Sequence, residues 1–522
     1  MAVTVGFEPT VGGYPTQLFE SCTFGRSDTS PQKSVRHTRG CRESPDCPAS
    51  RLHGIPGTKT FHRHTVDSVP DTTTNQRLVL SIAVLASFVA FLDGTVVNVA
   101  LPAIRNELGG GLSTQQWVVD SYLITLGALI LVAGSVSDAY GRMLVLRIGL
   151  IGFGIASVAI AAAPTAEFLI VARALQGAAG AFLVPSSLAL ITSTFHGPAQ
   201  ARAIGTWTAL TTGAMVVGPV AGGLFTDYLS WRFAFLVNVL PIGVALWLMV
   251  RANVRDIRRP DASIDWLGAI MCTLGLGAMV FALIEQPNLG WSSPATWVPL
   301  GGGALLFLGF LLRQRTVRAP ILPLDLFRVR NFWTGNVATV FVYAALSLNG
   351  FVVAVYLQQS AGLTATLAGL ASLPITILMI LLSSRVGDLA GHWGPRVFMT
   401  VGPVLMGVGS LLLLTVAADF SYWWQVFPSM IVFGLGLSLT VTPLTSTILG
   451  SIDSTRSGIA SAVNNAVSRV AGLVAIALLA PILGGELDLE GFHRAAIVTA
   501  ILLVAGGVVS FLGIRNPARE HA

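Results

Sequence analysis

The chain has 522 residues, of which 53% are hydrophobic and 11% are charged, and its formal net charge is +6. Soluble globular proteins carry about 25% charged residues, so this chain has too few charged side chains to cover a water-facing body, which excludes a soluble enzyme. Apolar runs that reach the roughly 20 residues needed to cross a bilayer recur along the chain and predict a polytopic, all-α membrane protein.

Residues 1–76 differ from the rest of the chain. They are rich in Ser, Thr, Pro, Arg and His, show neither a helical nor a strand period, and lack the apolar core of a signal peptide. A disordered polar extension is the favoured interpretation, a mis-assigned translation start is an alternative, and a metal-binding His tract is less favoured. We expect no function from this segment.

From Leu78 onward the sequence predicts fourteen spans joined by short loops, with the Gly and Pro residues that membrane helices tolerate. The expected limits are 78–102, 115–137, 143–163, 166–194, 202–226, 231–250, 264–284, 296–312, 332–357, 364–387, 396–417, 422–448, 459–482 and 494–514. The longest loops flank the seventh and eighth spans. We therefore predict two six-helix halves, residues 77–250 and 331–515, an inserted helix pair with its linkers at 251–330, and a short tail at 516–522.

The arginines predict the orientation in the membrane. If the N-terminus is cytoplasmic, the inside segments hold eighteen arginines and the outside segments hold three, which are Arg105, Arg232 and Arg494. Because cytoplasmic loops carry the excess of basic residues, this bias predicts a protein of the cytoplasmic membrane with both termini in the cytoplasm. It also explains the positive net charge without a nucleic-acid partner.

A loop pattern repeats in the two predicted halves. Residues 134–142 follow the second span and residues 387–396 follow the tenth, each with glycines seven positions apart and a nearby Arg. Repeated halves around a site at the membrane midplane are typical of secondary transporters.

Few charged residues lie within the predicted spans. Asp93, Arg173 and Arg469 are central, whereas Asp120 and Glu285 lie near span ends. Each central charge costs about 2.5–3.5 kcal/mol on insertion scales, so we expect these side chains to face the bundle interior or water. At about 1.5 Å per helical residue, Asp93 and Arg173 lie about 14 Å and 11 Å from the same membrane surface, a similar depth for a proton-coupling pair. The alternative is a static ion pair that fixes the helix register.

The fourth span places Arg173, Gln176, Gly177 and Gly180 on one helix face. The small residues allow a second helix to approach, and Gln176 offers a hydrogen bond at that contact. The candidates for the translocation path are Asn98, Gln176 and Arg469.

The fifth span is rich in glycine around one proline. It carries Gly205, Gly218, Pro219, Gly222 and Gly223. Pro219 removes a backbone hydrogen bond, and the glycines allow both bending and close packing. A hinge for alternating access and ordinary small-residue packing both remain open.

The turn after the second span holds a candidate cytoplasmic gating loop, formed by Gly134, Asp138, Gly141 and Arg142. Asp138 and Arg142 are four residues apart, so they pair if the turn is helical, and Arg142 near a helix end would hold the cytoplasmic side shut. The alternative is a solvated charge that only sets topology.

These stretches together resemble the major facilitator superfamily and, within it, the fourteen-span drug:proton antiporters. Residues 93–102 are similar to that group's first-span motif and residues 134–142 to the superfamily's loop motif. Residues 173–177 are similar to the fourth-span motif, whose Arg is associated with proton coupling, and residues 205–223 to the fifth-span motif associated with antiport. The resemblance covers about Leu78 to Arg515. Ala139 and Met143 depart from it, because the loop motif usually has basic residues there.

The resemblance implies a major facilitator fold and proton-coupled efflux of lipophilic drugs or toxic small molecules by alternating access. It implies a monomer in the lipid bilayer whose partners are protons and a small lipophilic substrate, with no cofactor or metal beyond the proton gradient. The alternatives are a major facilitator transporter of one specific metabolite and a non-transporting sensor or scaffold of the same fold. A membrane-embedded enzyme is disfavoured, because His196, His392 and His493 are scattered singly over loops.

Overall fold

The computed structural model describes residues 72–252, 264–318, 320–453, 456–484 and 487–516. Within these ranges the regular secondary structure is helical throughout, and fourteen helical segments are long and apolar enough to cross a membrane. The prediction of an all-α protein with fourteen membrane spans is therefore confirmed by length and composition. The predicted extension and tail lie outside the described residues, except that α1 already begins at Thr72 and the last described residue is Asn516.

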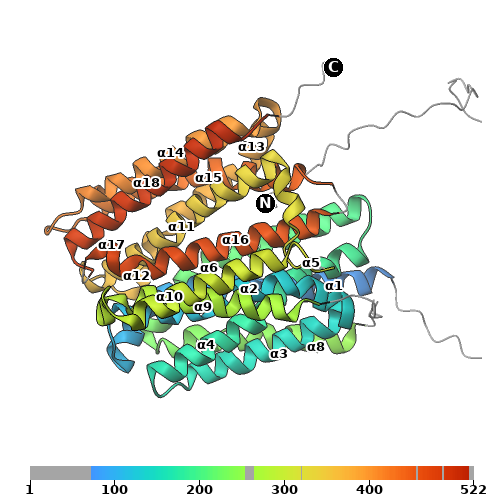
Figure 1. Ribbon diagram of the computed structural model, residues 1–522, viewed down its shortest axis with the longest axis horizontal. Coiled ribbons are helices and arrows are strands. Elements are labelled where there is room, and N and C mark those ends of the chain that lie inside the picture. The colour runs from blue at the N-terminus through green and yellow to red at the C-terminus, as the bar shows by residue number, and fades with distance from the viewer. Residues whose placement is uncertain (1–71, 253–263, 319, 454–455, 485–486, 517–522) are drawn as a thin grey trace, which may run out of the picture. The chain divides into compact units, whose positions relative to one another are not determined.

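The N-terminal helix group runs from α1 to α8 (Figure 1). Its members are α1 (Thr72–Leu108), α2 (Leu112–Tyr140), α3 (Arg142–Ala161), α4 (Ala166–Gly180), α5 (Leu183–Thr194), α6 (Pro198–Tyr228), α7 (Arg232–Leu236) and α8 (Val239–Arg251). Within this group two predicted spans are interrupted, since α4 and α5 share one and α7 and α8 share another. The break before α8 is where the structure places a polar side chain of the site described below.

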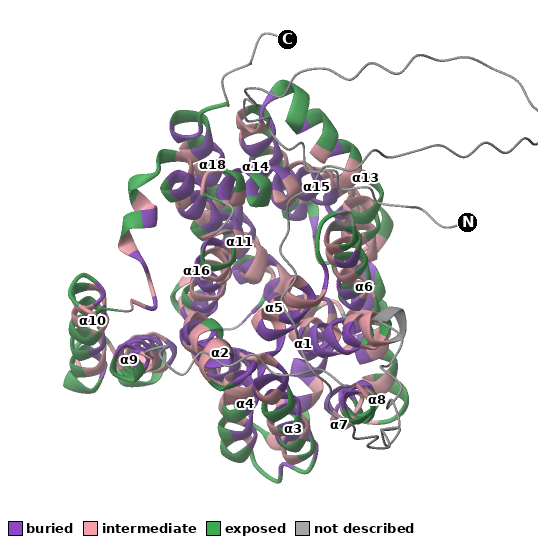
Figure 2. Ribbon diagram, turned by 90° about the vertical axis from the view of Figure 1, so that its right-hand side faces the viewer, coloured by how far each residue is buried: buried purple, intermediate pink, exposed green. Residues whose placement is uncertain are grey.

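The inserted pair consists of α9 (Trp266–Leu289) and α10 (Pro294–Arg313), which pack on each other. Figure 2 shows α9 beside α2 and α16, with α10 on the outer side of α9. Buried Asp265 links the start of α9 to the end of α10. Its carboxylate accepts hydrogen bonds from Gly268 N, Arg313 Nε and Gln314 Nε2. Burial alone would raise the pKa of Asp265, but the hydrogen bonds led by Arg313 hold it below its usual value.

The C-terminal helix group runs from α11 to α18. Its long helices are α11 (Arg330–Gln359), α13 (Leu373–Trp393), α14 (Pro395–Leu412), α15 (Phe427–Gly450), α16 (Ser457–Ala477) and α18 (Leu489–Gly513). Shorter segments are α12 (Ala365–Ala371), α17 (Leu479–Leu483), and the single turns η2 (Leu413–Thr415) and η3 (Tyr422–Val426). A further single turn, η1 (Leu324–Arg328), precedes α11. The two groups with the pair between them give the predicted six-plus-two-plus-six arrangement.

The two groups meet at one end of the bundle. We call this the Arg105 end, the opposite one the Arg142 end, and the contact of α1 with α11, α2 with α16 and α6 with α12 the seam. A buried apolar cluster fills it, with Val97 and Leu101 of α1 against Leu348 and Phe351 of α11. The hydrogen bonds across the seam, in the described ranges, join Arg105 to Gln359, Gln116 to the carbonyl of Ile476, and Asp227 to the backbone N–H groups of Ala365 and Thr366. The seam therefore closes the bundle at the Arg105 end.

Candidate functional site

Asp93 lies in the middle of α1 with no exposed surface, and its carboxylate is surrounded by donors. Arg173 Nη1 lies 2.6 Å from Asp93 Oδ2. Gln176 Nε2 and Asn238 Nδ2 donate to Asp93 Oδ1 at 2.9 and 3.0 Å. The partners of this acid of α1 thus come from α4 and from the junction between α7 and α8, while Ser157 of α3 bonds Gln176 behind them. Because an unpaired charge in a membrane interior is costly, this ring of donors is what allows a carboxylate to remain there.

Arg173 is also buried and makes several contacts of its own. It is 1% exposed, its Nε donates to the carbonyl of Val118 at 3.0 Å, and its guanidinium carbon lies 4.2 Å from the centre of the Tyr122 ring. The close approach of α4 to α2 depends on Gly177, because a Cβ there would lie 2.2 Å from the carbonyl oxygen of Tyr122. Gly177 lies one turn from Arg173, so the close packing at this glycine places the guanidinium next to α2.

Two members of the network were missed in the sequence. Asn238 is a polar residue in the otherwise apolar stretch 233–250, and that isolation is the signal for it in the sequence. Ser157 of α3, whose Oγ accepts from Gln176 Nε2 at 2.9 Å, gives no signal, because buried serines are common in membrane helices. Of the predicted path residues, the structure therefore brings Gln176 to Asp93.

Asn98 and Arg469 lie outside this network. Asn98 is half-buried on α1, and its Nδ2 lies 4.0 Å from where a Cβ on Gly350 of α11 would lie. Arg469 lies on α16, with its Cβ 3.5 Å from where a Cβ on Gly127 of α2 would lie. Its buried Nε has no hydrogen-bond partner in the structure. Both side chains thus lie between the two helix groups, where a translocated molecule would pass.

The predicted gating loop forms an ion pair within the N-terminal group. Arg142 Nη2 lies 3.1 Å from Asp138 Oδ1, and Arg142 Nη1 donates to the carbonyl of Ala189 on α5 at 2.9 Å. The turn is not one continuous helix, because Gly141 takes a φ of +106° that breaks it between α2 and α3. Gly134 is exposed on α2. In this conformation the pair links α2, α3 and α5 and makes no hydrogen bond to the described residues of the C-terminal group.

The glycines of the fifth span face two different neighbours. The helix α6 runs without interruption from Pro198 through Pro219 to Tyr228 and also contains Gly205. A Cβ on Gly218 or Gly222 would lie 2.0 Å from Thr95 Oγ1 or 2.6 Å from Val96 Cγ2 of α1. A Cβ on Gly223 would lie 2.5 Å from the Cα of Thr366 on α12. Close packing is therefore visible in the structure, and a hinge at Pro219 stays a prediction.

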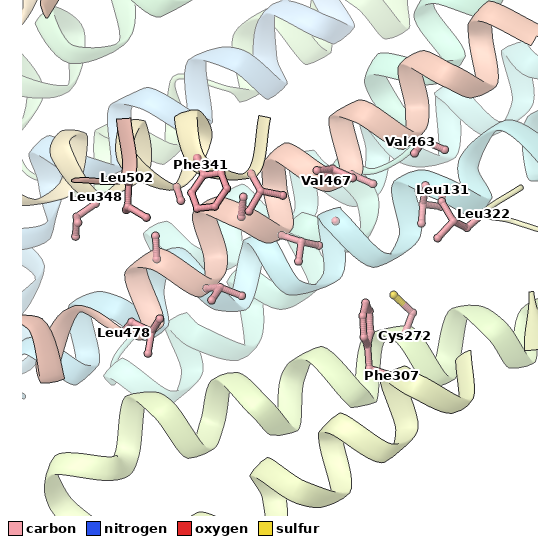
Figure 3. A pocket seen from close by; sticks show the side chains of 18 of the residues that line it. Leu131, Cys272, Phe307, Leu322, Phe341, Leu348, Val463, Val467, Leu478 and Leu502 are labelled. Atoms are coloured by element: carbon pink, nitrogen blue, oxygen red, sulfur yellow. The ribbon is translucent and has the colours of Figure 1, made fainter. Parts of the chain in front are cut away.

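An apolar cavity of about 430 Å³ lies between the inserted pair and the two helix groups. Figure 3 shows Cys272 of α9 and Phe307 of α10 on one side, with Val467 of α16 and Phe341 of α11 on the other. All the lining side chains are apolar, apart from the Cys272 thiol, and the volume lies within the roughly 300–1,000 Å³ of small-molecule sites.

Residues 83–476 match the profile of the Major Facilitator Superfamily. The chain belongs to this superfamily. The predicted resemblance is thus confirmed, and the all-α, fourteen-span architecture described above is this superfamily's fold with an inserted helix pair. The protein is a multi-pass membrane protein of a transporter family and not an enzyme.

Relatives of this major facilitator include drug-resistance proteins. The methylenomycin A resistance protein of Bacillus subtilis (strain 168) is 32% identical over 77% of this chain and 86% of its own length. The puromycin resistance protein of Streptomyces alboniger is 34% identical over 77% of this chain and 80% of its own length. Among solved structures, a peptide transporter in complex with sulfate covers 85% of this chain and 97% of its own, with a TM-score of 0.62 and 14% identity. That likeness concerns the fold alone.

Proposed function

We propose that this protein exports lipophilic drugs or toxic small molecules across the cytoplasmic membrane in exchange for protons, without a cofactor. The observation that carries the proposal is the buried Asp93–Arg173 pair with its ring of side-chain donors. The names of the resistance proteins to which the chain is similar supply the class of cargo.

In the proposed cycle a proton on Asp93 changes the balance of the whole network. Protonation neutralises the carboxylate and leaves Arg173 buried without its counter-ion, which is costly in a membrane interior. A rearrangement of α1, α4 and α8 that brings Arg173 to water or to another partner then lowers the free energy. This links proton binding to helix movement, which is what an antiporter acting as a monomer requires.

The closed seam assigns this structure to one state of the proposed transport cycle. The arginine bias makes the Arg105 end the outer end, so a closed seam corresponds to a state that opens toward the cytoplasm. In the opposite state α2 and α16, and α6 and α12, would separate, while Asp138 and Arg142 would help to close the other end.

The expected effect of Asp93→Asn tests this function. The amide keeps the size of the side chain but binds no proton, so we expect efflux driven by a proton gradient to fall by at least tenfold in proteoliposomes or whole cells. Exchange of labelled for unlabelled substrate without a gradient should persist, since it needs no net proton transfer.

The matched control for that experiment is Asp388→Asn, which alters an exposed acid on α13. Gradient-driven efflux by the Asp93→Asn protein at the level of the control would remove Asp93 from the mechanism. Running the assay with chemically diverse compounds also separates a multidrug exporter from a transporter of one metabolite, which would move a single member of the panel.

The apolar cavity supports a lipophilic substrate, and filling it should affect transport. Val467→Trp adds bulk to the cavity wall, so we expect a several-fold rise in KM for lipophilic substrates with a smaller change in kcat. Val504→Trp, the same change on the exposed outer face of α18, should leave both constants near the wild-type values. Equal kinetics for the two variants would exclude the cavity from the substrate route.

A further inference from the structure

Asp120 of α2 is a second buried acid, and its surroundings are the opposite of those of Asp93. It has no exposed surface, and neither of its carboxylate oxygens has a hydrogen-bond partner in the structure. No other carboxylate among the described residues is buried in this way without a partner. The proposed mechanism makes no use of it, so its presence in a membrane helix needs its own explanation.

Helical spacing places Asp120 at the seam. It shares a face of α2 with Gln116, one turn before it, and with Gly127, two turns after it. Gln116 donates to the carbonyl of Ile476, and Gly127 packs against Arg469, so this face contacts α16 of the C-terminal group. The second amide atom of Gln116, Oε1, is also buried without a partner. Polar groups are therefore enclosed when the seam is closed.

The titratable groups of the helices packed against α2 do not neutralise Asp120. Arg173 lies across α2, where it bonds the carbonyl of Val118, and it is committed to Asp93 of α1. Glu285 of α9 accepts from the Trp117 indole and from Asn288. Arg469 of α16 lies two turns away opposite Gly127, and Arg142 of α3 pairs with Asp138. Arg105 and Glu107 of α1 bond Gln359 and Arg232, and Arg147 of α3 and Glu167 of α4 are exposed. The Cys272 thiol of α9 lines the cavity, and α5 has no charged residue.

The cost of burying an ion decides which form of Asp120 fits. An ionised carboxylate without a partner in a low-dielectric interior costs several kcal/mol, whereas the protonated acid avoids most of this cost. If α2 and α16 separate, water reaches the side chain, and the free-energy cost of ionising Asp120 falls. Protonation and closure of the seam are therefore thermodynamically linked.

We propose that Asp120 is a proton-binding site that controls the seam: the contact of α2 with α16 closes when Asp120 takes up a proton and opens when the proton leaves. This inference rests on the proposed antiport function. It adds a proton site that is reached from the Arg105 end and is separate from the Asp93 network. Because the site is enclosed by the seam itself, its proton gates the conformational change and does not need to cross the membrane.

The test measures seam opening against pH. Spin labels on Gly111→Cys, at the start of α2, and Pro481→Cys, on α17, are placed in a chain whose native cysteines are replaced by serine, and their distance distribution is recorded in nanodiscs from pH 5 to 9. In the otherwise unchanged chain we expect the long-distance population to grow as pH rises. Asp120→Asn, which is neutral at every pH, should stay in the short-distance state throughout.

Further variants keep the outcome clear. Asp120→Glu restores a titrating acid, so it should regain the transition with a shifted midpoint even if Asp120→Asn folds poorly. Asp93→Asn should keep a transition, because Asp120 is intact. If the Asp120→Asn protein shows the transition with the wild-type midpoint, the proposal is overturned. The proposal is also overturned if the transition is lost in Asp93→Asn and kept in Asp120→Asn, but that result leaves the proposed antiport intact. A transition lost in Asp120→Asn while Asp93→Asn exports normally supports this site and contradicts the role of Asp93.

Discussion

Arg173→Ala is expected to be the most damaging single substitution in the protein. It leaves Asp93 buried beside two amides with no counter-charge, and breaking a buried ion pair from one side costs about 3–5 kcal/mol. It also removes the hydrogen bond to the Val118 carbonyl and the contact with the Tyr122 ring. We expect a marked fall in the melting temperature of the purified protein and in its abundance in the membrane.

Two further variants show whether charge is the cause. Asp93→Asn combined with Arg173→Ala leaves neither charge, so its melting temperature should recover in part while gradient-driven efflux stays lost. Arg494→Ala breaks a half-exposed pair with Glu490 and should cost about 1 kcal/mol or less. A double variant no more stable than Arg173→Ala would show that lost packing, and not the uncompensated acid, sets the cost.

Gly223→Ala is the second change with a large expected effect. The added Cβ would lie 2.5 Å from the Cα of Thr366 and 2.7 Å from the carbonyl oxygen of Ala365. These are backbone atoms, so the contact is relieved only if α6 and α12 move apart at the seam. We expect a shift toward the state that is open at the Arg105 end and at least a tenfold loss of efflux, measured beside the labelled seam distances.

Gly213→Ala is the matched control, because a Cβ there meets no atom within 4 Å and the helix is the same. Alanine has the higher helix propensity at both positions, so a difference between the two variants comes from the contact with α12. Efflux by Gly223→Ala at the level of Gly213→Ala would contradict the view that this glycine holds the seam together.

The sequence did not predict which helix each glycine of α6 packs against. The sequence left a hinge and close packing as alternatives, because glycine permits both. The structure shows that consecutive glycines serve different partners: Gly222 lies against α1 and Gly223 against α12. A sequence records spacing along a helix but not its rotation against each neighbour, and here a rotation of one residue changes the partner.

The sequence by itself determined the spans and the costly charges. A bilayer requires long apolar helices and penalises any acid within them, so the order of apolar and charged residues along the chain identifies both the fourteen spans and Asp93. Only the tertiary structure decided what each charge meets. Asp93 and Asp120 are both acids in apolar helices, yet the first is bonded by Arg173, Gln176 and Asn238, and the second has no hydrogen-bond partner among the described residues. That difference arises because residues far apart in the chain, on α1, α4 and the α7–α8 junction, meet around Asp93. Helix packing of this kind is specified by contacts in space, not by distance along the chain.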